Sequence, residues 1–204
     1  IICKESYRTT KQGGILVWVV NDQTKGGSET GTSFKQALKF IEHGWLLNDT
    51  MIWKKTNPMP QVKQPRYNQV FEYMFVFSKG KPKTFNPIMV PCKKAGQLYD
   101  STTKVIDGGR TRVKKTFNIN PFKYDSNIWE IGVAQNKTKH IAVFPDKLCE
   151  RHILSWTNEG DLVCDFFLGS GTTLKVAKKL NRQIIGCDID KEYCELATEL
   201  IFLQ

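Results

Sequence analysis

The residues best suited to chemistry form a glycine-rich turn in the last third of the chain. The turn, Gly169-Ser170-Gly171-Thr172-Thr173, follows a strand predicted over residues 161–167 and opens a helix predicted over 172–180. Glycines let a ligand approach the backbone, while the unpaired N–H groups of a helix start and the threonine hydroxyls supply hydrogen-bond donors. The pattern therefore predicts a ligand site at the amino end of this helix.

Two carboxylates accompany the turn. Asp165 lies just before it, and Asp188 ends the next predicted strand, 183–187, at 17 residues from Gly171. An acid near this spacing is typical of one that binds both hydroxyls of a nucleoside ribose. Either acid alone could instead cap a turn or the following helix. Together with the glycines, they favour a site for a nucleoside-bearing cofactor.

The details of the turn discriminate among such cofactors. A loop for nucleoside triphosphates would end in Gly-Lys-Ser or Gly-Lys-Thr, which this turn does not. A dinucleotide loop would have a third glycine where Leu174 stands, and Asp165 would repel a pyrophosphate. The same carboxylate can accept hydrogen bonds from an ammonium group, so S-adenosylmethionine fits better than NAD. An NAD-dependent oxidoreductase stays open as the alternative enzyme.

The elements around the turn predict an α/β fold. Because a single helix joins strand 161–167 to strand 183–187, the two strands should be parallel and adjacent. A further helix is predicted over 190–201, and Pro145 can open one more. The residues expected to face inward from the helix after Pro145 are Cys149, Ile153 and Trp156. Phe166 and Phe167 either stack on the ligand or pack against the sheet.

The first part of the chain predicts a half-sheet with a β-ribbon. Strands are expected over 13–20, 45–53 and 70–77, where apolar and aromatic residues are concentrated. Between the first two, Ser33 can cap a helix that ends at Gly44. The apolar face expected for this helix consists of Phe34, Ala37, Leu38 and Ile41.

Positive charge is concentrated in one irregular segment. The chain has 204 residues and a net charge of +10, and residues 78–123 alone carry 11 Lys and Arg against 2 Asp. Prolines and glycines interrupt this segment, which predicts a loop with short strands at most. Because Lys and Arg displace counterions from phosphates, the segment suits contact with nucleic acid. The candidate DNA-contacting residues are Arg66, Lys79, Lys81, Arg110, Arg112, Lys114 and Lys115.

Other interpretations of this charge stay open. A solvated surface loop would carry the same residues without a partner. A non-catalytic DNA-binding module would bind DNA with a steep salt dependence and without regard to a cofactor.

Composition narrows the class of protein. A chain of this length with 40% hydrophobic residues can bury a core and is expected to form one domain with an insertion. No apolar run approaches the ~20 residues that span a bilayer, and the N-terminus lacks a signal-peptide layout, so we expect a soluble cytoplasmic protein without a membrane partner. The six cysteines have no zinc-like spacing, which predicts no metal site and reduced, mostly buried thiols.

Several segments together resemble the amino-group DNA methyltransferases of the β motif order. Residues 165–173, Asp-Phe-Phe-Leu-Gly-Ser-Gly-Thr-Thr, are similar to that family's cofactor loop, and residues 140–145, His-Ile-Ala-Val-Phe-Pro, to its upstream segment. The blocks at 185–190, 13–18, 53–60 and 72–79 extend the resemblance over most of the chain. Phe166 and Ile141 stand where the family usually has Pro, and Asp188 stands where Glu is more common.

The resemblance implies a Rossmann-like sheet with a reversed β-hairpin and S-adenosylmethionine as methyl donor. The implied reaction is methyl transfer to an exocyclic amino group, adenine N6 or cytosine N4, of a flipped base in double-stranded DNA. Residues 1–77 and 140–204 would form the catalytic and cofactor halves of one domain, with a recognition insertion and connector at 78–139. The implied cofactor-binding residues are Asp165, Phe166, Phe167, Gly169, Ser170, Gly171, Thr172, Thr173, Asp188, Phe144 and His140.

The family's context adds further expectations. It implies a bacterial or phage-encoded enzyme of DNA methylation or restriction–modification, with a homodimer as one oligomeric state. An amino methyltransferase acting on RNA stays open as an alternative.

One family element does not occur in this sequence. The family's polar-Pro-Pro-aromatic tetrapeptide, which binds the target amino group, should precede Gly13, and no such tetrapeptide is found. We therefore expect that an N-terminal part is missing, that no catalytic residue can be assigned, and that the chain as given binds cofactor without turnover.

Overall fold

The computed structural model describes residues 1–58, 66–107, 109–134 and 143–202, and for 101–107 and 109–115 it describes the backbone alone. The chain forms two compact units, one of Ile1–Asn86 with Asn127–Gln204 and the other of Pro87–Ser126. The separate unit is shorter than the predicted insertion and connector. Asn86, the residue just before it, bonds the carbonyl of Ser155 in the first unit through its N–H.

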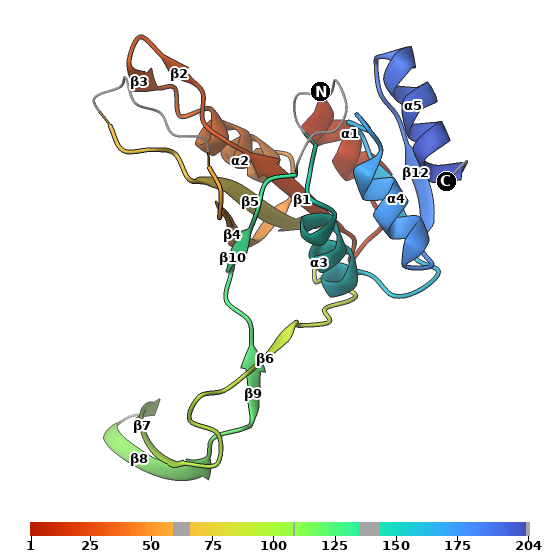
Figure 1. Ribbon diagram of the computed structural model, residues 1–204. Coiled ribbons are helices and arrows are strands. Elements are labelled where there is room, and N and C mark those ends of the chain that lie inside the picture. The colour runs from red at the N-terminus through yellow and green to blue at the C-terminus, as the bar shows by residue number, and fades with distance from the viewer. Residues whose placement is uncertain (59–65, 108, 135–142, 203–204) are drawn as a thin grey trace. The chain divides into compact units, whose positions relative to one another are not determined.

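A four-stranded sheet forms the centre of the first part of the chain (Figure 1). Its order is β1 (Ile15–Val20), β5 (Phe71–Ser78), β4 (Leu46–Lys55) and β10 (Ile128–Ile131). β5 is antiparallel to both of its neighbours, whereas β10 runs parallel to β4. The three strands predicted in this region and the reversed hairpin of β4 and β5 are thus confirmed.

Aromatic packing holds two helices against this sheet. The helices are α1 (Ile2–Thr9) and α2 (Thr32–Glu42), and a small hairpin of β2 (Thr24–Lys25) and β3 (Ser28–Glu29) precedes α2. Phe40 stacks on Phe77 with ring centroids 4.9 Å apart, and Trp45 is 1% exposed beside them. Burying such large side chains supplies most of the local driving force.

The predicted apolar face of α2 is wrong in part. The buried residues are Ser33, Ala37 and Phe40, whereas Phe34, Leu38 and Ile41 are 42–60% exposed. Gly31, in the left-handed region, occupies the position before the helix, and Ser33 lies inside it. Apolar residues occupy more of the surface of this helix than the sheet can bury. Helical periodicity alone therefore predicts the wrong set of buried residues.

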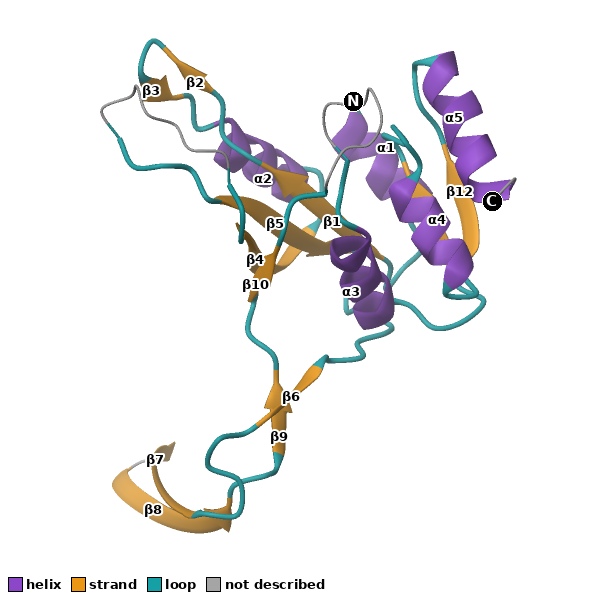
Figure 2. Ribbon diagram, viewed as in Figure 1, coloured by secondary structure: helices purple, strands orange, loops and turns teal. Residues whose placement is uncertain are grey.

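The C-terminal part is the βαβα unit that the sequence predicts. It consists of β11 (Leu162–Asp165), α4 (Thr172–Lys179), β12 (Gln183–Gly186) and α5 (Lys191–Phe202), and it follows α3 (Asp146–Trp156). β11 and β12 pair in parallel, as expected. Figure 2 shows α4 and α5 beside β12, and α4 also contacts α3 and β11.

Two small apolar clusters stabilise this unit. One joins α3 to α4 through residues that include Cys149, Ile153 and Ala177, and the other joins α4 to α5 through Leu174 and Ala197. The expected inward positions of Cys149 and Ile153 are confirmed. Trp156 is half-buried and stacks instead on the exposed ring of Phe85, at 4.9 Å between centroids.

The two sheets approach each other at one aromatic contact. Trp18 of β1 and Phe167, just after β11, have ring centroids 5.8 Å apart. Within the described residues, β1 pairs only with β5, and β11 only with β12. This contact brings the loop after β11 to the first sheet.

The second unit is built from two antiparallel ribbons. β6 (Met89–Pro91) pairs with β9 (Phe122–Tyr124), and β7 (Leu98–Asp107) pairs with β8 (Gly109–Asn118) over ten positions. The prediction of a loop with short strands at most was therefore wrong. The sequences of β7 and β8 have no regular alternation of apolar and polar residues, so hydrophobic periodicity could not reveal these strands.

The cysteines also differ from expectation. All six are free thiols, but only Cys149 is buried, and Cys164 and Cys187 are exposed. Burial raises the pKa of the Cys149 thiol to about 11. Among the described helices, none is long and apolar enough to cross a membrane.

Candidate functional site

The turn after β11 is shaped by its own backbone and by one acid. Asp165 Oδ1 accepts the N–H of Phe167 at 3.0 Å, and the Gly171 N–H donates to the Leu168 carbonyl at 2.8 Å. These bonds reverse the chain so that Gly171 precedes the first residue of α4. Asp165 therefore shapes the turn, which is the structural alternative to ligand binding that the sequence left open. Among the described residues, no N–H of the turn donates to its other oxygen, Oδ2.

The two glycines of the turn serve different ends. Gly171 has a φ of +81°, and a Cβ there would lie 2.7 Å from the Cβ of Ala197 on α5. It thus permits both the backbone conformation and the close approach of α5 to α4. At Gly169, with a φ of +49°, the nearest atom to an added Cβ is the Phe167 carbonyl oxygen, 3.9 Å away. This side of the turn is open to a ligand.

Asp188 ties the end of β12 to the turn. Its Oδ2 accepts the N–H of Gly169 at 2.8 Å, and its Oδ1 accepts the N–H of Asp190 at 3.0 Å. These backbone donors hold the pKa of Asp188 below its usual range, so it is ionised at neutral pH. Because each carboxylate oxygen can accept a second hydrogen bond, the group keeps capacity for a diol.

The hydroxyl residues at the start of α4 face different neighbours. Ser170 Oγ lies 3.2 Å from Thr172 Oγ1, next to the free N–H groups of the first helical turn. Thr173 Oγ1 lies 3.8 Å from the Cys149 sulfur on α3. Thr173 therefore faces the helix packing, and we leave it out of the proposed ligand set.

A cavity of about 560 Å³ adjoins the start of α4. This volume is within the range of small-molecule sites, about 300–1,000 Å³. Three predicted residues, Phe144, Ser170 and Thr172, line it, and the predicted Asp165 and Asp188 do not. The other lining residues are Ile131, Gly132, Ala134, Val143, Pro145, Asp146, Lys147, Lys175, Leu196 and Leu200.

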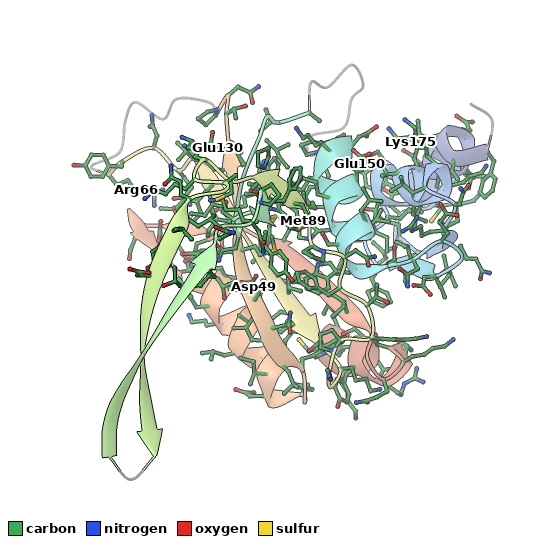
Figure 3. The ribbon with its side chains drawn as sticks, turned by 90° about the horizontal axis from the view of Figure 1, so that it is seen from below. Asp49, Arg66, Met89, Glu130, Glu150 and Lys175 are labelled. Atoms are coloured by element: carbon green, nitrogen blue, oxygen red, sulfur yellow. The ribbon has the colours of Figure 1, made fainter. Side chains whose placement is uncertain are left out.

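An ion pair fixes one wall of the cavity. Lys175 Nζ on α4 donates to both oxygens of Asp146 at the start of α3, at 2.8 and 2.7 Å. Figure 3 labels Lys175 and, on the neighbouring helix, Glu150. The pair is partly exposed and contributes little stability by itself, but it sets where the two helix starts lie.

Another part of the cavity wall is held by residues to which sequence reasoning gave no role. Asn57 Oδ1 accepts the N–H of Val133 at 2.9 Å, and Trp53 Nε1 donates to the Ile131 carbonyl at 2.8 Å. The Trp53 ring also meets Phe144, with centroids 6.3 Å apart. The family resemblance of the block at 53–60 is the only sequence signal for these residues, because the backbone groups that they bond lie about 76 residues away.

The remaining cofactor candidates divide three ways. Phe166 is half-buried, and its carbonyl accepts the Cys187 thiol at 3.8 Å. Phe167 is 56% exposed and lies against Trp18. His140 lies outside the described residues. The structure thus brings Asp165, the turn and Asp188 together at the carboxyl ends of β11 and β12, where open α/β sheets bind ligands.

The residues present fit an adenosyl cofactor. An ionised carboxylate, an open glycine and a free helix start lie within one turn, beside a cavity of suitable volume. The carboxylate complements a ribose diol, and the helix start beside the open glycine complements the carboxylate of the cofactor.

Two DNA candidates outside the basic ribbon have structural partners. Lys79 Nζ donates to the carbonyls of Tyr7 and Thr10, at 2.7 and 2.8 Å, and lies over the Tyr7 ring. Arg66 bonds Thr24 and lies 3.7 Å from a Glu29 oxygen. Lys79 therefore caps α1 and Arg66 joins the β2–β3 hairpin, so both side chains have structural roles. Lys81 is exposed.

Four further candidates, Arg110, Arg112, Lys114 and Lys115, lie on β8, where their backbone is described.

Comparison with known proteins gives a consistent set of relatives. A family model described as DNA methylase matches residues 2–199. The orphan methyltransferase M.BamHII of Bacillus amyloliquefaciens is 47% identical over 209 residues, covering 96% of this chain and 77% of the relative. The type II methyltransferase M.SmaI of Serratia marcescens is 29% identical, covering 84% of this chain. The chain spans about half the length of M.SmaI, 51%.

Solved structures agree in fold. The PvuII DNA methyltransferase (cytosine-N4-specific) has a TM-score of 0.72 at 22% identity, with 100% of this chain and 68% of that chain covered. The M1.HpyAVI–SAM complex has a TM-score of 0.68 at 25% identity, with 98% and 80% covered.

Proposed function

Because this chain belongs to the DNA methylase family, we propose that it holds S-adenosylmethionine for methyl transfer to an exocyclic amino group of duplex DNA. The fold is that of the S-adenosylmethionine-dependent class, with a mixed α/β sheet. The relatives' names support site-specific modification of DNA, and they do not favour an oxidoreductase.

The observation that carries the proposal is the bond between Asp188 and Gly169. It places an ionised carboxylate beside the open face of the glycine turn, at the carboxyl ends of two parallel strands. A pyrophosphate would meet two negative carboxylates here, Asp165 and Asp188. A nucleoside with a cationic amino acid chain would meet complementary charges instead.

We assign roles to residues of the turn on this basis. Asp188 accepts hydrogen bonds from the ribose hydroxyls, and the free oxygen of Asp165 accepts from the α-amino group. Ser170 and Thr172 present backbone donors to the carboxylate, while Gly169 and Gly171, whose N–H groups bond Asp188 and Leu168, shape the turn around it. Phe144 covers the adjoining cavity with Trp53 behind it.

The bound cofactor supplies an electrophilic methyl group on its sulfonium. The protein has to keep that group oriented and its surroundings free of competing nucleophiles. Burial raises the pKa of the Cys149 thiol on α3 to about 11 and keeps it protonated, so it does not compete. Adenine N6 and cytosine N4 are both kept as target atoms.

The expected homodimer is tested by light scattering, in which a monomer mass at micromolar concentration would contradict it.

Isothermal calorimetry tests the cofactor assignment. The full chain should bind S-adenosylmethionine and S-adenosylhomocysteine, and Asp188→Asn should weaken both by about 10-fold or more, because one charged acceptor is lost. Asp190→Asn is the matched control, since Asp190 caps the N–H of Glu192 and has no bond to the turn. Tighter binding of NADH, or equal losses in both variants, would overturn the assignment.

A further inference from the structure

The β7–β8 hairpin is long enough to follow one turn of duplex DNA. Its strands pair without interruption from Leu98 opposite Asn118 to Asp107 opposite Gly109. Ten residues at about 3.4 Å each extend roughly 34 Å, close to the helical repeat of B-DNA. The two strands lie side by side as a twisted ribbon (Figures 1 and 3).

The register assigns every residue of the hairpin to one of two faces. Directly opposed residues share a face, and faces alternate along each strand. Two contacts at the base confirm this alternation. Thr116 Oγ1 donates to Asp100 Oδ1 at 2.6 Å on one face, while the rings of Tyr99 and Phe117 lie 5.5 Å apart on the other.

Charge is segregated between these faces. The face of Asp100 and Thr116 carries four basic positions toward the tip, Lys104, Arg110, Arg112 and Lys114, and no acid among them. The face of Tyr99 and Phe117 carries one basic residue, Lys115, and one acid, Asp107; its other positions are Ser, Thr, Val and Gly. A charge that served only solubility would have no reason to occupy one face.

The basic face contains an unfavourable pairing. Lys104 stands directly opposite Arg112 in the register. Like charges at opposed positions destabilise an antiparallel pair. Two more basic positions, Arg110 and Lys114, flank Arg112 on the same face. An extended anion along this face would reduce the repulsion among these four positive charges.

We propose that this face, defined by Lys104, Arg110, Arg112 and Lys114, lies in the major groove of duplex DNA. The inference rests on the proposed function, and it adds which face of which element meets the DNA. The major groove of B-DNA admits a two-stranded β-ribbon, whereas the minor groove of undeformed B-DNA is only about 6 Å wide. The deep major groove of A-form RNA is likewise closed to such a ribbon. Lys115 leaves the set of DNA contacts because the register places it on the opposite face.

Neighbouring lysines provide a matched test. Fluorescence anisotropy of the full chain on a labelled 30-base-pair duplex, titrated with KCl, gives affinity and salt slope. Lys114→Gln should weaken binding about 3- to 10-fold and reduce the slope of log K against log[salt] by about 1, because one phosphate contact is lost. Lys115→Gln should change affinity less than about 2-fold. Equal losses from both variants would overturn the proposal, and matching circular dichroism melts exclude misfolding.

Groove competition provides a second readout. Methyl green, which occupies the major groove, should displace the protein, and netropsin, which occupies the minor groove, should not. Displacement by netropsin alone, or tighter binding to an RNA duplex of the same sequence, would refute the assigned face. Calorimetry with S-adenosylmethionine separates the two proposals. If the cofactor binds but Lys114→Gln and Lys115→Gln have the same DNA affinity, the assigned DNA face alone is rejected. If the cofactor does not bind but the two variants differ in DNA affinity, the proposed function alone is rejected.

Discussion

Asp188 accepts the backbone N–H of Gly169 across 2.8 Å and thereby joins the ends of two parallel strands. The sequence separates the two residues by 19 positions, and the intervening helix α4 brings them back to the same edge. One carboxylate therefore fixes the glycine turn and faces the ligand side of it. This double role explains why an acid, and not an amide or hydroxyl, suits the position.

Acid should loosen this turn. The backbone donors lower the folded-state pKa of Asp188 below 3.8, so its contribution to stability is present above its unfolded pKa and is lost as pH falls through the folded value. Urea unfolding of wild type and Asp188→Asn should therefore differ at pH 6, and the difference should shrink as pH falls below 3.8. A difference that stays constant with pH would contradict this.

Buried His152 should make the fold acid-sensitive in a higher pH range. Burial lowers its pKa to about 3 from 6.5, and its ring lies 4.6 Å from that of Trp129. The unfolded chain binds the proton first, so stability should fall as pH drops from about 6.5 toward 3, by at most ~1.4 kcal/mol per pH unit. In urea titrations between pH 7 and 4, His152→Phe should lack this component. An unchanged pH profile would argue against a buried neutral histidine.

The two turn glycines should respond differently to alanine. Gly171→Ala adds a Cβ 2.7 Å from that of Ala197 and should cost about 1–3 kcal/mol of unfolding free energy beyond the strain of a positive φ. Gly169→Ala carries the strain alone, about 1–2 kcal/mol, since no atom is closer than 3.9 Å. Thermal melts of the two variants compare them, and equal losses would show that α5 yields at this contact.

Local pattern was enough to predict the βαβα unit, its parallel pairing and the half-sheet. Local pattern failed where a residue's contacts are distant in sequence, or where the face of a helix or strand is not marked by apolar residues. The stripe of α2 depends on which side the sheet covers, and Phe34 and Leu38 satisfy the helical period without being buried. The hairpin of β7 and β8 is held by its ladder, which leaves no hydrophobic signature.

The same limit applies to the candidate site. Asp165, the glycine turn and Asp188 were found because they are close in sequence and constrained by one motif. The cavity wall at Ile131 and Gly132 was not, because Trp53 and Asn57, which bond the backbone of Ile131 and Val133, lie 76 to 78 residues away in sequence.

Lys79 should prove structural, not DNA-binding. Its ammonium satisfies two carbonyls at the end of α1, so Lys79→Met should lower stability by about 1–2 kcal/mol. Lys81→Met removes an equal charge from an exposed position two residues away and should leave the melting temperature unchanged. A stability loss confined to Lys79→Met supports the capping role, and equal melts would contradict it.

Asn57 should control the cavity through one backbone bond. Its Oδ1 accepts the N–H of Val133 just beyond β10, and Gly132 and Ala134 beside it line the cavity. In Asn57→Ala this wall loses its anchor, so we expect cofactor affinity to fall about 3- to 10-fold, the cost of one exposed hydrogen bond. The sheet itself should persist because the pairing of β4 with β10 does not involve this side chain.

Asn127 offers the matched control, since its side-chain amide donates to the Thr50 carbonyl at 3.1 Å, just before the other end of β10. Both substitutions remove one side-chain bond to the backbone, but only Asn57 lies next to the cavity wall. Calorimetry with S-adenosylhomocysteine should therefore separate them, with Asn127→Ala close to wild type. Equal losses of affinity in the two variants would contradict the prediction. They would show that β10 responds as one rigid strand and that the Asn57 bond does not itself position the cavity wall.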